Sequence, residues 1–196
     1  MQIHFISDLH LCADRPALTA VFERYLAGPA RAAARLYILG DLFEYWAGDD
    51  DLDDPLNTHV AGLLADLAES GCQVFFMPGN RDFLIGADFA ARARLQLLAE
   101  PARIELGNEA VLLCQGDSLC TDDLAYQAFR SQVRNPAWQA QFLGQPLAVR
   151  KQVIAGVRMK SEEAKSEKAA AIMDVNAEAV IALLREHGVH QLIHGH

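Results

Sequence analysis

The sequence of 196 residues lacks the long apolar runs that membrane-spanning helices require. No stretch approaches the roughly 20 consecutive apolar residues of a membrane span. The N-terminus also has no basic segment ahead of an apolar one, so a secretory signal is not indicated. We therefore expect a cytoplasmic protein.

Cysteine is scarce, and its spacing is uninformative for metal or redox chemistry. The chain has four cysteines and no CxxC pair. In a cytosolic chain of this size we expect reduced thiols and no disulfide framework.

Positive charge is also scarce overall, but it is concentrated in one segment. The net charge is −9, which argues against a general nucleic-acid binder. Residues 121–170 nevertheless hold eight Lys or Arg and five acids, so this segment is +3 and the remainder −12. A basic segment on an acidic body indicates an anionic ligand or a phospholipid surface, or else only a solvated helical face.

Short apolar stretches alternate with amphipathic ones along much of the chain. The predicted strands cover residues 3–7, 35–41, 72–77, a hairpin over 102–114 and a final strand over 189–196. The predicted helices cover residues 15–28, 57–70, 82–95 and most of 121–187, the last broken or kinked at Pro136, Gly144–Pro146 and Gly156. This alternation is typical of a layered α/β protein. We expect one domain over 1–196, with 121–187 inserted between two core strands.

Side chains that can bind metals follow five of the predicted strands. They are Asp8 with His10, Asp41, Asn80 with Asp82 on either side of Arg81, Gln115 with Asp117, and His194 with His196. Each alone suits a turn, a helix cap or a structural histidine. The carboxyl ends of strands in α/β sheets meet at one ligand-binding edge, so the five together favour a site for two metal ions.

The spacing and types of these residues indicate which metals they bind. Asp8 and His10 lie two residues apart, which places both side chains on one side of an extended chain. The two oxygens of Asp41 can bridge two cations. Mixed oxygen and nitrogen ligands suit Mn, Fe, Zn or Co better than a thiolate-selected metal.

The motifs "DLH", "GDLFE", "GNRD", "QGD" and "HGH" resemble the successive blocks of the calcineurin-like metallophosphoesterases. Arg81 within "GNRD", and the stretches "GDLFEYWAGDD", "GNRDFLIG", "GDSLCTDDLAYQ" and "AIMDVN", are similar to the lipid A pathway pyrophosphatases that hydrolyse UDP-2,3-diacylglucosamine. The resemblance covers the whole chain. It implies a layered αββα sandwich in which the helical insertion over about 121–187 forms a lid.

The resemblance also implies a role for each motif residue. Asp8 and His10 hold the first of two Mn²⁺ ions, Asp41 bridges, and Asn80, Gln115 and His196 hold the second. Arg81 and His196 are the catalytic residues that stabilise charge in the transition state. The residues that contact substrate are Asn80, Arg81, Asp123, Ser161, Lys165, Lys168 and His196.

Two departures from the family pattern bear on the metal sites. Gln115 stands where the family has a histidine ligand, and a carboxamide oxygen is a weaker ligand for these metals. We therefore expect a weakened second site, unless Gln115 only fills space. The family block also continues past His196 to a further histidine, so we expect that the C-terminal part of the family domain is missing.

The implied reaction is hydrolysis of UDP-2,3-diacylglucosamine to UMP and 2,3-diacylglucosamine 1-phosphate (lipid X). The implied partners are this lipid and the cytoplasmic face of the inner membrane, where the protein is peripheral, with no protein partner and no nucleic acid. Two alternatives stay open. One is a phosphodiesterase or phosphatase of the same fold that acts on soluble nucleotides. The other is an impaired relative that binds lipid without turnover because of Gln115.

Overall fold

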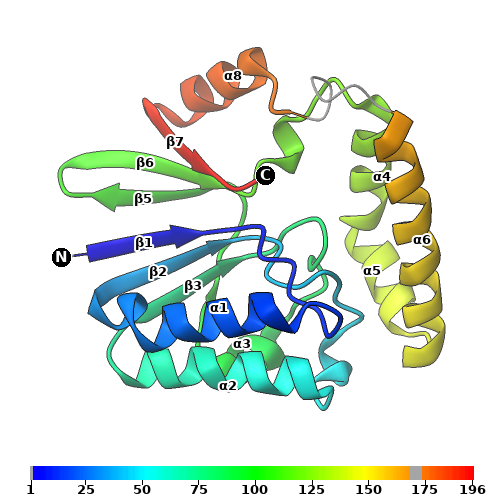
Figure 1. Cartoon of the computed structure of the whole chain (residues 1–196). Helices are drawn as coiled ribbons and strands as arrows, with labels where there is room; N and C mark the ends of the chain where they lie inside the picture. The colour runs from blue at the N-terminus through cyan, green and yellow to red at the C-terminus, as the bar shows by residue number, and fades with distance from the viewer. Residues whose placement is uncertain (1, 168–173) are drawn as a thin grey trace. The chain divides into compact units, whose positions relative to one another are not determined.

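A computed structural model describes residues 2–167 and 174–196, and for 160–167 only the course of the helix (Figure 1). The chain forms two compact units. The first extends to Glu100 and includes Gly195, and the second comprises Pro101–His194 and His196. Each unit carries some of the predicted site residues and is described by itself.

The first unit contains a parallel sheet of four strands in the order β1-β2-β3-β4. The strands are β1 (Gln2–Ile6), β2 (Ala33–Leu39), β3 (Gln73–Met77) and β4 (Gln96–Leu97). The first three confirm the sequence prediction, whereas β4 is too short to have given a signal. Because the strands are parallel, the turns after β1, β2 and β3 all leave the same edge of the sheet.

Apolar rows across this sheet form the core of the first unit. The aromatic rings of Phe5, Tyr37 and Phe75 stack in register across β1, β2 and β3, with centroids 5.1 and 4.8 Å apart. Ile38 and Phe76 of the next row are fully buried. Burial of such side chains fixes the strand register, and the register in turn fixes where each strand ends.

Three helices cover one face of the sheet in Figure 1. They are α1 (Pro16–Ala27), α2 (Pro55–Glu69) and α3 (Ala87–Ala93), and short 3₁₀ turns lie at η1 (Pro29–Ala32) and η2 (Asp49–Asp51). Helix α2 begins two residues before its predicted start. The Asp54 carboxylate accepts the amide of Leu56, and Pro55 occupies the first helical position.

The predicted helix over 82–95 is too long, because its first residues form a loop. Helix α3 begins only at Ala87, where the Asp49 carboxylate accepts the backbone amides of Gly86, Asp88 and Phe89. A carboxylate that binds several free amides at a helix N-terminus stabilises the helix start at that point.

The second unit contains the strands β5 (Ala102–Leu106), β6 (Glu109–Cys114) and β7 (Gln191–His194). As predicted, β5 and β6 form a hairpin, with Gly107 at φ 65° in its turn. Strand β7 pairs with β6 in parallel, so the turns after β6 and β7 leave the same edge. Helix α8 (Ala177–His187) precedes β7 and lies beside it in Figure 1.

The helical segment of this unit comprises α4 (Leu124–Val133), α5 (Pro136–Leu143) and α6 (Leu147–Glu167), preceded by the turn η3 (Asp117–Leu119). The predicted breaks at Pro136 and Gly144–Pro146 are confirmed. The predicted break at Gly156 is wrong, since α6 continues through it. One glycine lowers helix stability by about 1 kcal/mol, which a long helix tolerates.

Within the part of the chain that the structure describes, no helix combines the length and apolarity of a membrane span. The assembly of the two sheets into one sandwich, and the role of 121–187 as a lid, stay predictions.

Candidate metal centre

The turns after β1 and β2 run side by side and carry the first ligands. The backbone amides of Asp8 and His10 donate to the carbonyl oxygens of Gly40 and Asp41, at 3.2 and 2.9 Å. Asp8 and His10 have left-handed backbones, with φ of 56° and 49°. The expected extended geometry at these two residues is therefore wrong, and the left-handed turns position the side chains instead.

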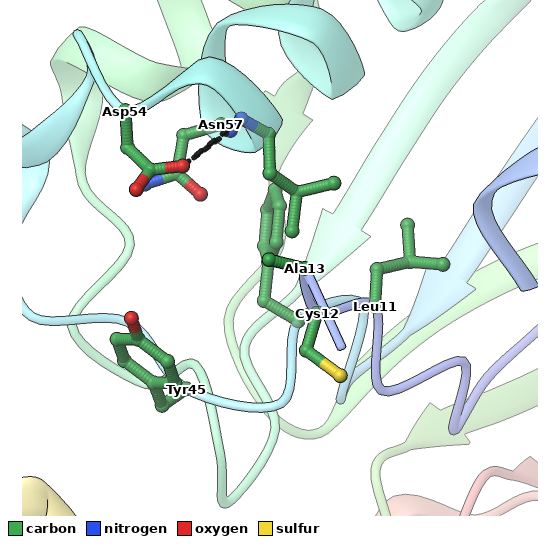
Figure 2. Close-up of a pocket in the computed structure, with 8 residues that line it drawn as sticks. Leu11, Cys12, Ala13, Tyr45, Asp54 and Asn57 are labelled. Carbon is green, nitrogen blue, oxygen red and sulfur yellow. Dashed lines mark hydrogen bonds between the residues drawn. The ribbon is translucent and has the colours of Figure 1, made fainter. Parts of the chain in front are cut away.

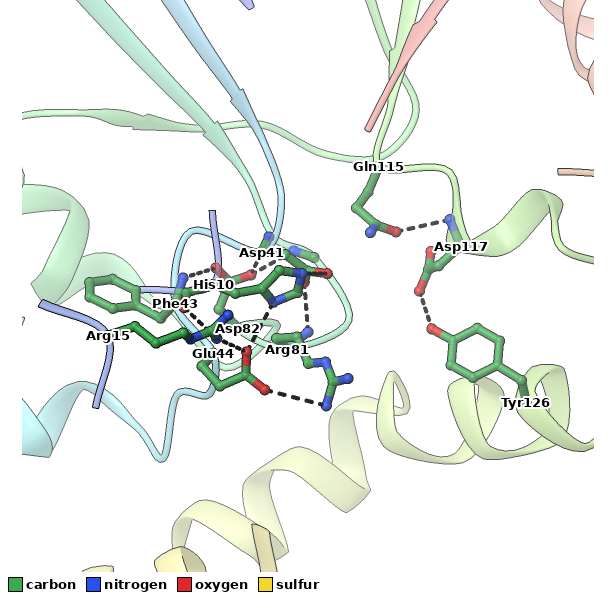
Figure 3. A network of polar contacts seen from close by, with 11 residues as sticks. His10, Arg15, Asp41, Phe43, Glu44, Arg81, Asp82, Gln115, Asp117 and Tyr126 are labelled. Carbon is green, nitrogen blue, oxygen red and sulfur yellow. Dashed lines mark hydrogen bonds and ion pairs between the residues drawn. The ribbon is translucent and has the colours of Figure 1, made fainter. Parts of the chain in front are cut away.

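The structure brings together the predicted ligands Asp8, His10 and Asp41. One ligand atom from each of the three lies within 4.8 Å of the others. The Asp41 side chain is only 2% exposed, and its Oδ2 lies 3.9 Å from Nε2 of His10 (Figure 3). Asp41 is itself left-handed, with φ 54°. Strained residues of this kind persist where the surrounding structure holds them, and they are often functional.

Gly79 is needed for Asp41 to occupy its place. A Cβ atom at Gly79 would overlap both Oδ1 and the backbone nitrogen of Asp41. The next residue but one, Arg81, donates its backbone amide to Asp41 Oδ1 at 2.8 Å. The turn after β3 therefore packs its backbone directly against the Asp41 carboxylate.

The Asn80 side chain tests whether this cluster suits a cation. Its amide lies between 2.5 and 3.1 Å from the two carboxylate oxygens of Asp41. When the Asn80 amide oxygen points toward Asp41, it faces the carboxylate oxygens, which are also acceptors and repel it. A cation bound to these oxygens would stabilise this orientation. Turned over, the amide nitrogen donates to Asp41. The first orientation, with the Asn80 oxygen beside the Asp41 oxygens, fits a divalent cation bound next to Asp41.

Asp82 was noted within "GNRD" at the end of the third predicted strand but was given no role. Its carboxylate is fully buried and accepts the backbone amides of Gly79, Asp41 and Phe43, at 2.8, 3.2 and 3.2 Å. It thereby ties the turn after β3 to the turn after β2. The only signal in the sequence is that Asp82 is an acid at the end of the motif "GNRD". That position does not reveal that the Asp82 carboxylate binds backbone amides.

Electrostatics at the cluster also favour a cation. Burial, together with the neighbouring Asp82, raises the pKa of Asp41, and burial raises the pKa of Asp82. Burial likewise lowers the pKa of His10, which keeps its imidazole neutral and able to bind a metal. Metal ligation requires deprotonated carboxylates and neutral imidazole. A bound cation therefore stabilises the deprotonated carboxylate of Asp41 and the neutral imidazole of His10.

A second carboxylate, Glu44, lies beside His10 and was not predicted. It is 8% exposed, and its Oε2 lies 2.8 Å from Nη2 of Arg15 and 3.4 Å from Nδ1 of His10 (Figure 3). Its Oε1 lies 4.0 Å from Nη1 of Arg81. The Nε atom of Arg81 is buried and has no hydrogen-bond partner among the described residues. This suits a guanidinium that binds an anion.

In the second unit, the turns after β6 and β7 carry the other predicted ligands. Gly116 lies against the turn after β7, since a Cβ there would meet the His196 carbonyl oxygen at 3.2 Å and His194 Nδ1 at 3.3 Å. The structure therefore places Gln115 and His196 in neighbouring turns, as predicted. Whether these turns and the first cluster form one site stays a prediction.

Gln115 is fully buried and stabilises its own turn. Its Oε1 accepts the backbone amide of Asp117 at 2.9 Å. This bond occupies one of the two lone pairs of the carboxamide oxygen. Its predicted role as a weak metal ligand is compatible with this geometry and untested.

Asp117 was noted beside Gln115 in the sequence but was given no role, and it connects the same turn to helix α4. Its buried carboxylate accepts the Tyr126 hydroxyl at 2.7 Å and pairs with Nε of Arg130 at 2.9 Å (Figure 3). Burial and the adjacent Asp117 raise the pKa of Tyr126, so the phenol stays protonated and donates. Helix α4 is thus held to the turn that carries Gln115.

The predicted substrate residues of the helical segment are described only in part. Asp123 is buried and caps α4, with its carboxylate accepting the Tyr126 amide at 3.1 Å. The side chains of Ser161 and Lys165, and all of Lys168, lie outside the described residues. Their predicted roles stay predictions.

A small pocket of the first unit lies next to the metal ligands in sequence (Figure 2). Its volume is about 40 Å³, and three of its lining residues directly follow His10 in the chain. The lining residues are Leu11, Cys12, Ala13, Phe43, Tyr45, Asp54, Leu56 and Asn57. A cavity of this size admits only a few water molecules, so it is too small for a nucleotide.

Comparison with known proteins identifies the family. The sequence model of the calcineurin-like phosphoesterase family matches residues 1–196. A UDP-2,3-diacylglucosamine hydrolase of Aromatoleum aromaticum is 62% identical over all 196 residues, which span 80% of that relative's length. The enzyme of the same name from Shigella dysenteriae is 52% identical over the whole chain and 81% of its own length.

Similarity to solved structures is low. The crystal structure of Pseudomonas putida nuclease MPE aligns with 58% of this chain and 53% of its own, at 18% identity and a TM-score of 0.43. That value supports no inference about the reaction. The family model and the two relatives decide the family. The chain belongs to the calcineurin-like phosphoesterases, which are metal-dependent hydrolases. Within them it belongs to the family of the relatives named UDP-2,3-diacylglucosamine hydrolase.

Proposed function

We propose that the protein is a Mn²⁺-dependent hydrolase of UDP-2,3-diacylglucosamine that releases UMP and 2,3-diacylglucosamine 1-phosphate in lipid A biosynthesis. One observation carries the proposal. The ligand atoms of Asp8, His10 and Asp41 converge within 4.8 Å in a chain that is 62% identical over its full length to a hydrolase of that name.

The residues that would hold two Mn²⁺ ions lie in the turns after β1, β2 and β3 of the first unit and after β6 and β7 of the second. Asp8 and His10 would bind the first ion, Asp41 would bind both, and Asn80, Gln115 and His196 would bind the second. When bound, the pair would neutralise phosphate charge and activate water at neutral pH. We expect the second ion to bind more weakly, because Gln115 offers an amide oxygen that already accepts the Asp117 amide.

The reaction is hydrolysis of an acid anhydride. The oxygen of water forms a bond to the phosphorus on the uridine side, the bond from that phosphorus to the bridging oxygen breaks, and the sugar 1-phosphate leaves. Arg81 and His196 would stabilise the charge that grows on the phosphate oxygens. The guanidinium of Arg81 is 14% exposed, and its partly desolvated charge is therefore effective toward an anion.

The helical segment supplies an apolar surface that suits acyl chains. Seven large apolar side chains of α4, α5 and α6 are more than a third exposed, namely Leu124, Phe129, Leu143, Val149, Val153, Val157 and Met159. Val149, Val153 and Val157 recur every four residues and so share one face of α6. We propose that this segment, residues 121–187, is the lid that binds the two acyl chains, with Asp123, Ser161, Lys165 and Lys168 contacting the head group.

The same segment suits a membrane surface. Its net charge of +3 over 121–170 and its exposed apolar side chains together fit peripheral binding to an anionic leaflet. We therefore place the protein in the cytoplasm, on the inner face of the inner membrane.

The experiment that separates this function from its alternatives compares substrates. The protein with Mn²⁺ is incubated with UDP-2,3-diacylglucosamine, with UDP-N-acetylglucosamine and with a soluble phosphodiester nucleotide. We expect UMP from the acylated substrate alone. Turnover of the soluble substrates at similar rates would favour a phosphodiesterase or phosphatase. Binding of the acylated substrate without turnover would favour an impaired relative.

A further inference from the structure

We propose that Glu44 is a positioning residue for the metal ligand His10. The buried carboxylate of Glu44 fixes which nitrogen of the imidazole carries the proton, so that the other nitrogen faces the metal. The proposal adds a residue to the site described above and rests on the metal-dependent function proposed for it.

The two imidazole nitrogens of His10 have different surroundings. Nε2 lies 3.9 Å from Oδ2 of Asp41, within the group of ligand atoms. Nδ1 lies 3.4 Å from Oε2 of Glu44 on the other side of the ring. Nδ1 is buried, and in the structure its contact with Glu44 is longer than a well-formed hydrogen bond.

These surroundings select one tautomer. A carboxylate accepts hydrogen bonds and donates none, so Glu44 favours the proton on Nδ1. The lone pair then remains on Nε2, where Asp41 and Asp8 provide the other ligand atoms. A metal-bound histidine commonly donates its second ring nitrogen to a carboxylate in this way, which orients the ring.

Arg15 holds Glu44 in place for this role. Its Nη2 donates to Glu44 Oε2 at 2.8 Å and to the backbone carbonyl of His10 at 2.9 Å. The same guanidinium therefore fixes both the carboxylate and the residue that the carboxylate orients. The Glu44 amide in turn donates to the Leu11 carbonyl at 3.0 Å, which keeps the two turns in register.

The alternative is that Glu44 only forms a structural ion pair with Arg15. The two readings differ in what they predict for metal binding and for the imidazole proton. A structural ion pair affects the stability of the fold and leaves the choice of imidazole nitrogen unchanged. A positioning residue affects metal affinity and tautomer even where the fold is intact.

The test uses Glu44→Gln in the metal-free, full-length protein, with Mn²⁺ affinity measured by isothermal titration calorimetry. We expect affinity to fall about 10- to 100-fold, as for other outer-shell partners of metal ligands. Glu23→Gln is the matched control. It makes the same change at a carboxylate of the same unit that pairs with His59 away from the cluster, and it should leave affinity unchanged.

Nitrogen NMR of the histidine rings provides a second measurement that is independent of activity. The His10 signal, assigned from its absence in His10→Ala, should report a proton on Nδ1 in the parent protein. In Glu44→Gln the carboxamide can also donate, so both tautomers should be populated. An unchanged tautomer together with Mn²⁺ affinity within twofold of the parent would overturn the proposal.

Arg15→Ala decides the matter if Glu44→Gln does not fold. The Arg15 side chain is 46% exposed, so its replacement by alanine leaves the packing of the core unchanged. Releasing Glu44 should then weaken Mn²⁺ binding severalfold, and unchanged affinity would overturn the proposal. Because no substrate is present in these measurements, their failure is distinguishable from failure of the proposed reaction.

Discussion

Backbone conformation at single residues determines the geometry of the metal cluster. Asp8, His10 and Asp41 all have φ near 50°, a region that non-glycine residues enter at a cost of about 1–3 kcal/mol each. Hydrogen bonds between the turns after β1 and β2 hold the first two, and the amide of Asp41 donates to the buried Asp82. The strain is therefore located where the ligands must converge.

The ligand types could be predicted from the sequence, but their backbone could not. Asp8, His10 and Asp41 were identified because acids and imidazoles directly followed apolar strands. The left-handed conformation gave no signal, since aspartate and histidine also occur in extended chains. Glu44 and Asp82 lie inside quoted motifs, yet their partners are a ring nitrogen and backbone amides, which spacing alone does not indicate.

Gly79→Ala should disrupt the cluster without changing any ligand. The added Cβ would overlap Asp41 and push it aside, and we expect a loss of stability of about 1–3 kcal/mol, as in other overpacked sites. Mn²⁺ affinity should fall at least tenfold by calorimetry. Gly62→Ala is the control, because Gly62 lies within α2 with nothing near its Cβ position, and it should stabilise by up to about 1 kcal/mol. Equal Mn²⁺ affinity in the two variants would contradict this role of Gly79.

Removal of metal should lower the thermal stability of the first unit. Without a cation, the buried carboxylates of Asp41 and Asp82 lie close together, and burial disfavours their charged forms. A ligand that binds only the folded state at 100 times its Kd adds about 2.7 kcal/mol of stability. We therefore expect Tm to fall on chelation and to recover on addition of Mn²⁺ to the parent protein. A Tm that is indifferent to Mn²⁺ would show that the cluster holds no such ion.

Among the elements, helix α4 is connected most directly to the candidate chemistry. Tyr126 and Arg130, one turn apart on α4, bind the buried carboxylate of Asp117 at 2.7 and 2.9 Å. Asp117 follows Gln115 in the turn after β6. The start of the helical segment is therefore fixed to the turn that carries a predicted metal ligand.

Tyr126→Phe should loosen this connection. It removes a hydrogen bond to a charged group, so we expect a decrease of about 1.5–3 kcal/mol in the free energy of unfolding, measured by urea denaturation. Tyr25→Phe is the matched change in the other unit. It removes a bond between the Tyr25 hydroxyl and Nδ1 of His4 at 2.9 Å and should have a smaller effect, about 1 kcal/mol. A larger loss for Tyr25→Phe would contradict the importance assigned to Asp117.

Helix boundaries were predictable where a residue, such as proline, cannot occupy the interior of a helix. Pro136 is the first residue of α5 and Pro146 directly precedes α6, because proline lacks the amide that a helix interior needs, and both breaks are confirmed. Gly156 has no such effect, and α6 continues through it. The late start of α3 could not be foreseen, since it depends on Asp49, which is 38 residues earlier in the chain than Ala87.

At the scale of the whole molecule, the account combines an acidic body with a basic, partly apolar helical segment. Asp8, His10 and Asp41 lie in the first unit, and the exposed valines of α6 lie in the second. The proposed function assigns phosphate chemistry to the first set and acyl-chain binding to the other. The sequence predicted the first set from local patterns, whereas the placement of the two units depends on contacts that local patterns do not encode.

Val153→Glu should therefore affect the lipid substrate selectively. Val153 is 43% exposed on α6, so the change leaves the core intact, but it places a charge against the proposed acyl chains. We expect KM for UDP-2,3-diacylglucosamine to rise about tenfold or more, since a charge in an apolar contact is strongly unfavourable. Val21→Glu on α1, at a site 52% exposed, should leave KM unchanged. Equal KM values in both variants would argue against a lid function of this face.

The most direct test of the central claim is Mn²⁺-dependent release of UMP from UDP-2,3-diacylglucosamine by the full-length protein, with Gln115→His measured beside it. The account predicts UMP release that stops on chelation, with tighter Mn²⁺ dependence in Gln115→His because imidazole is a stronger ligand than an amide oxygen. Absence of UMP release in both proteins at saturating Mn²⁺ would contradict it.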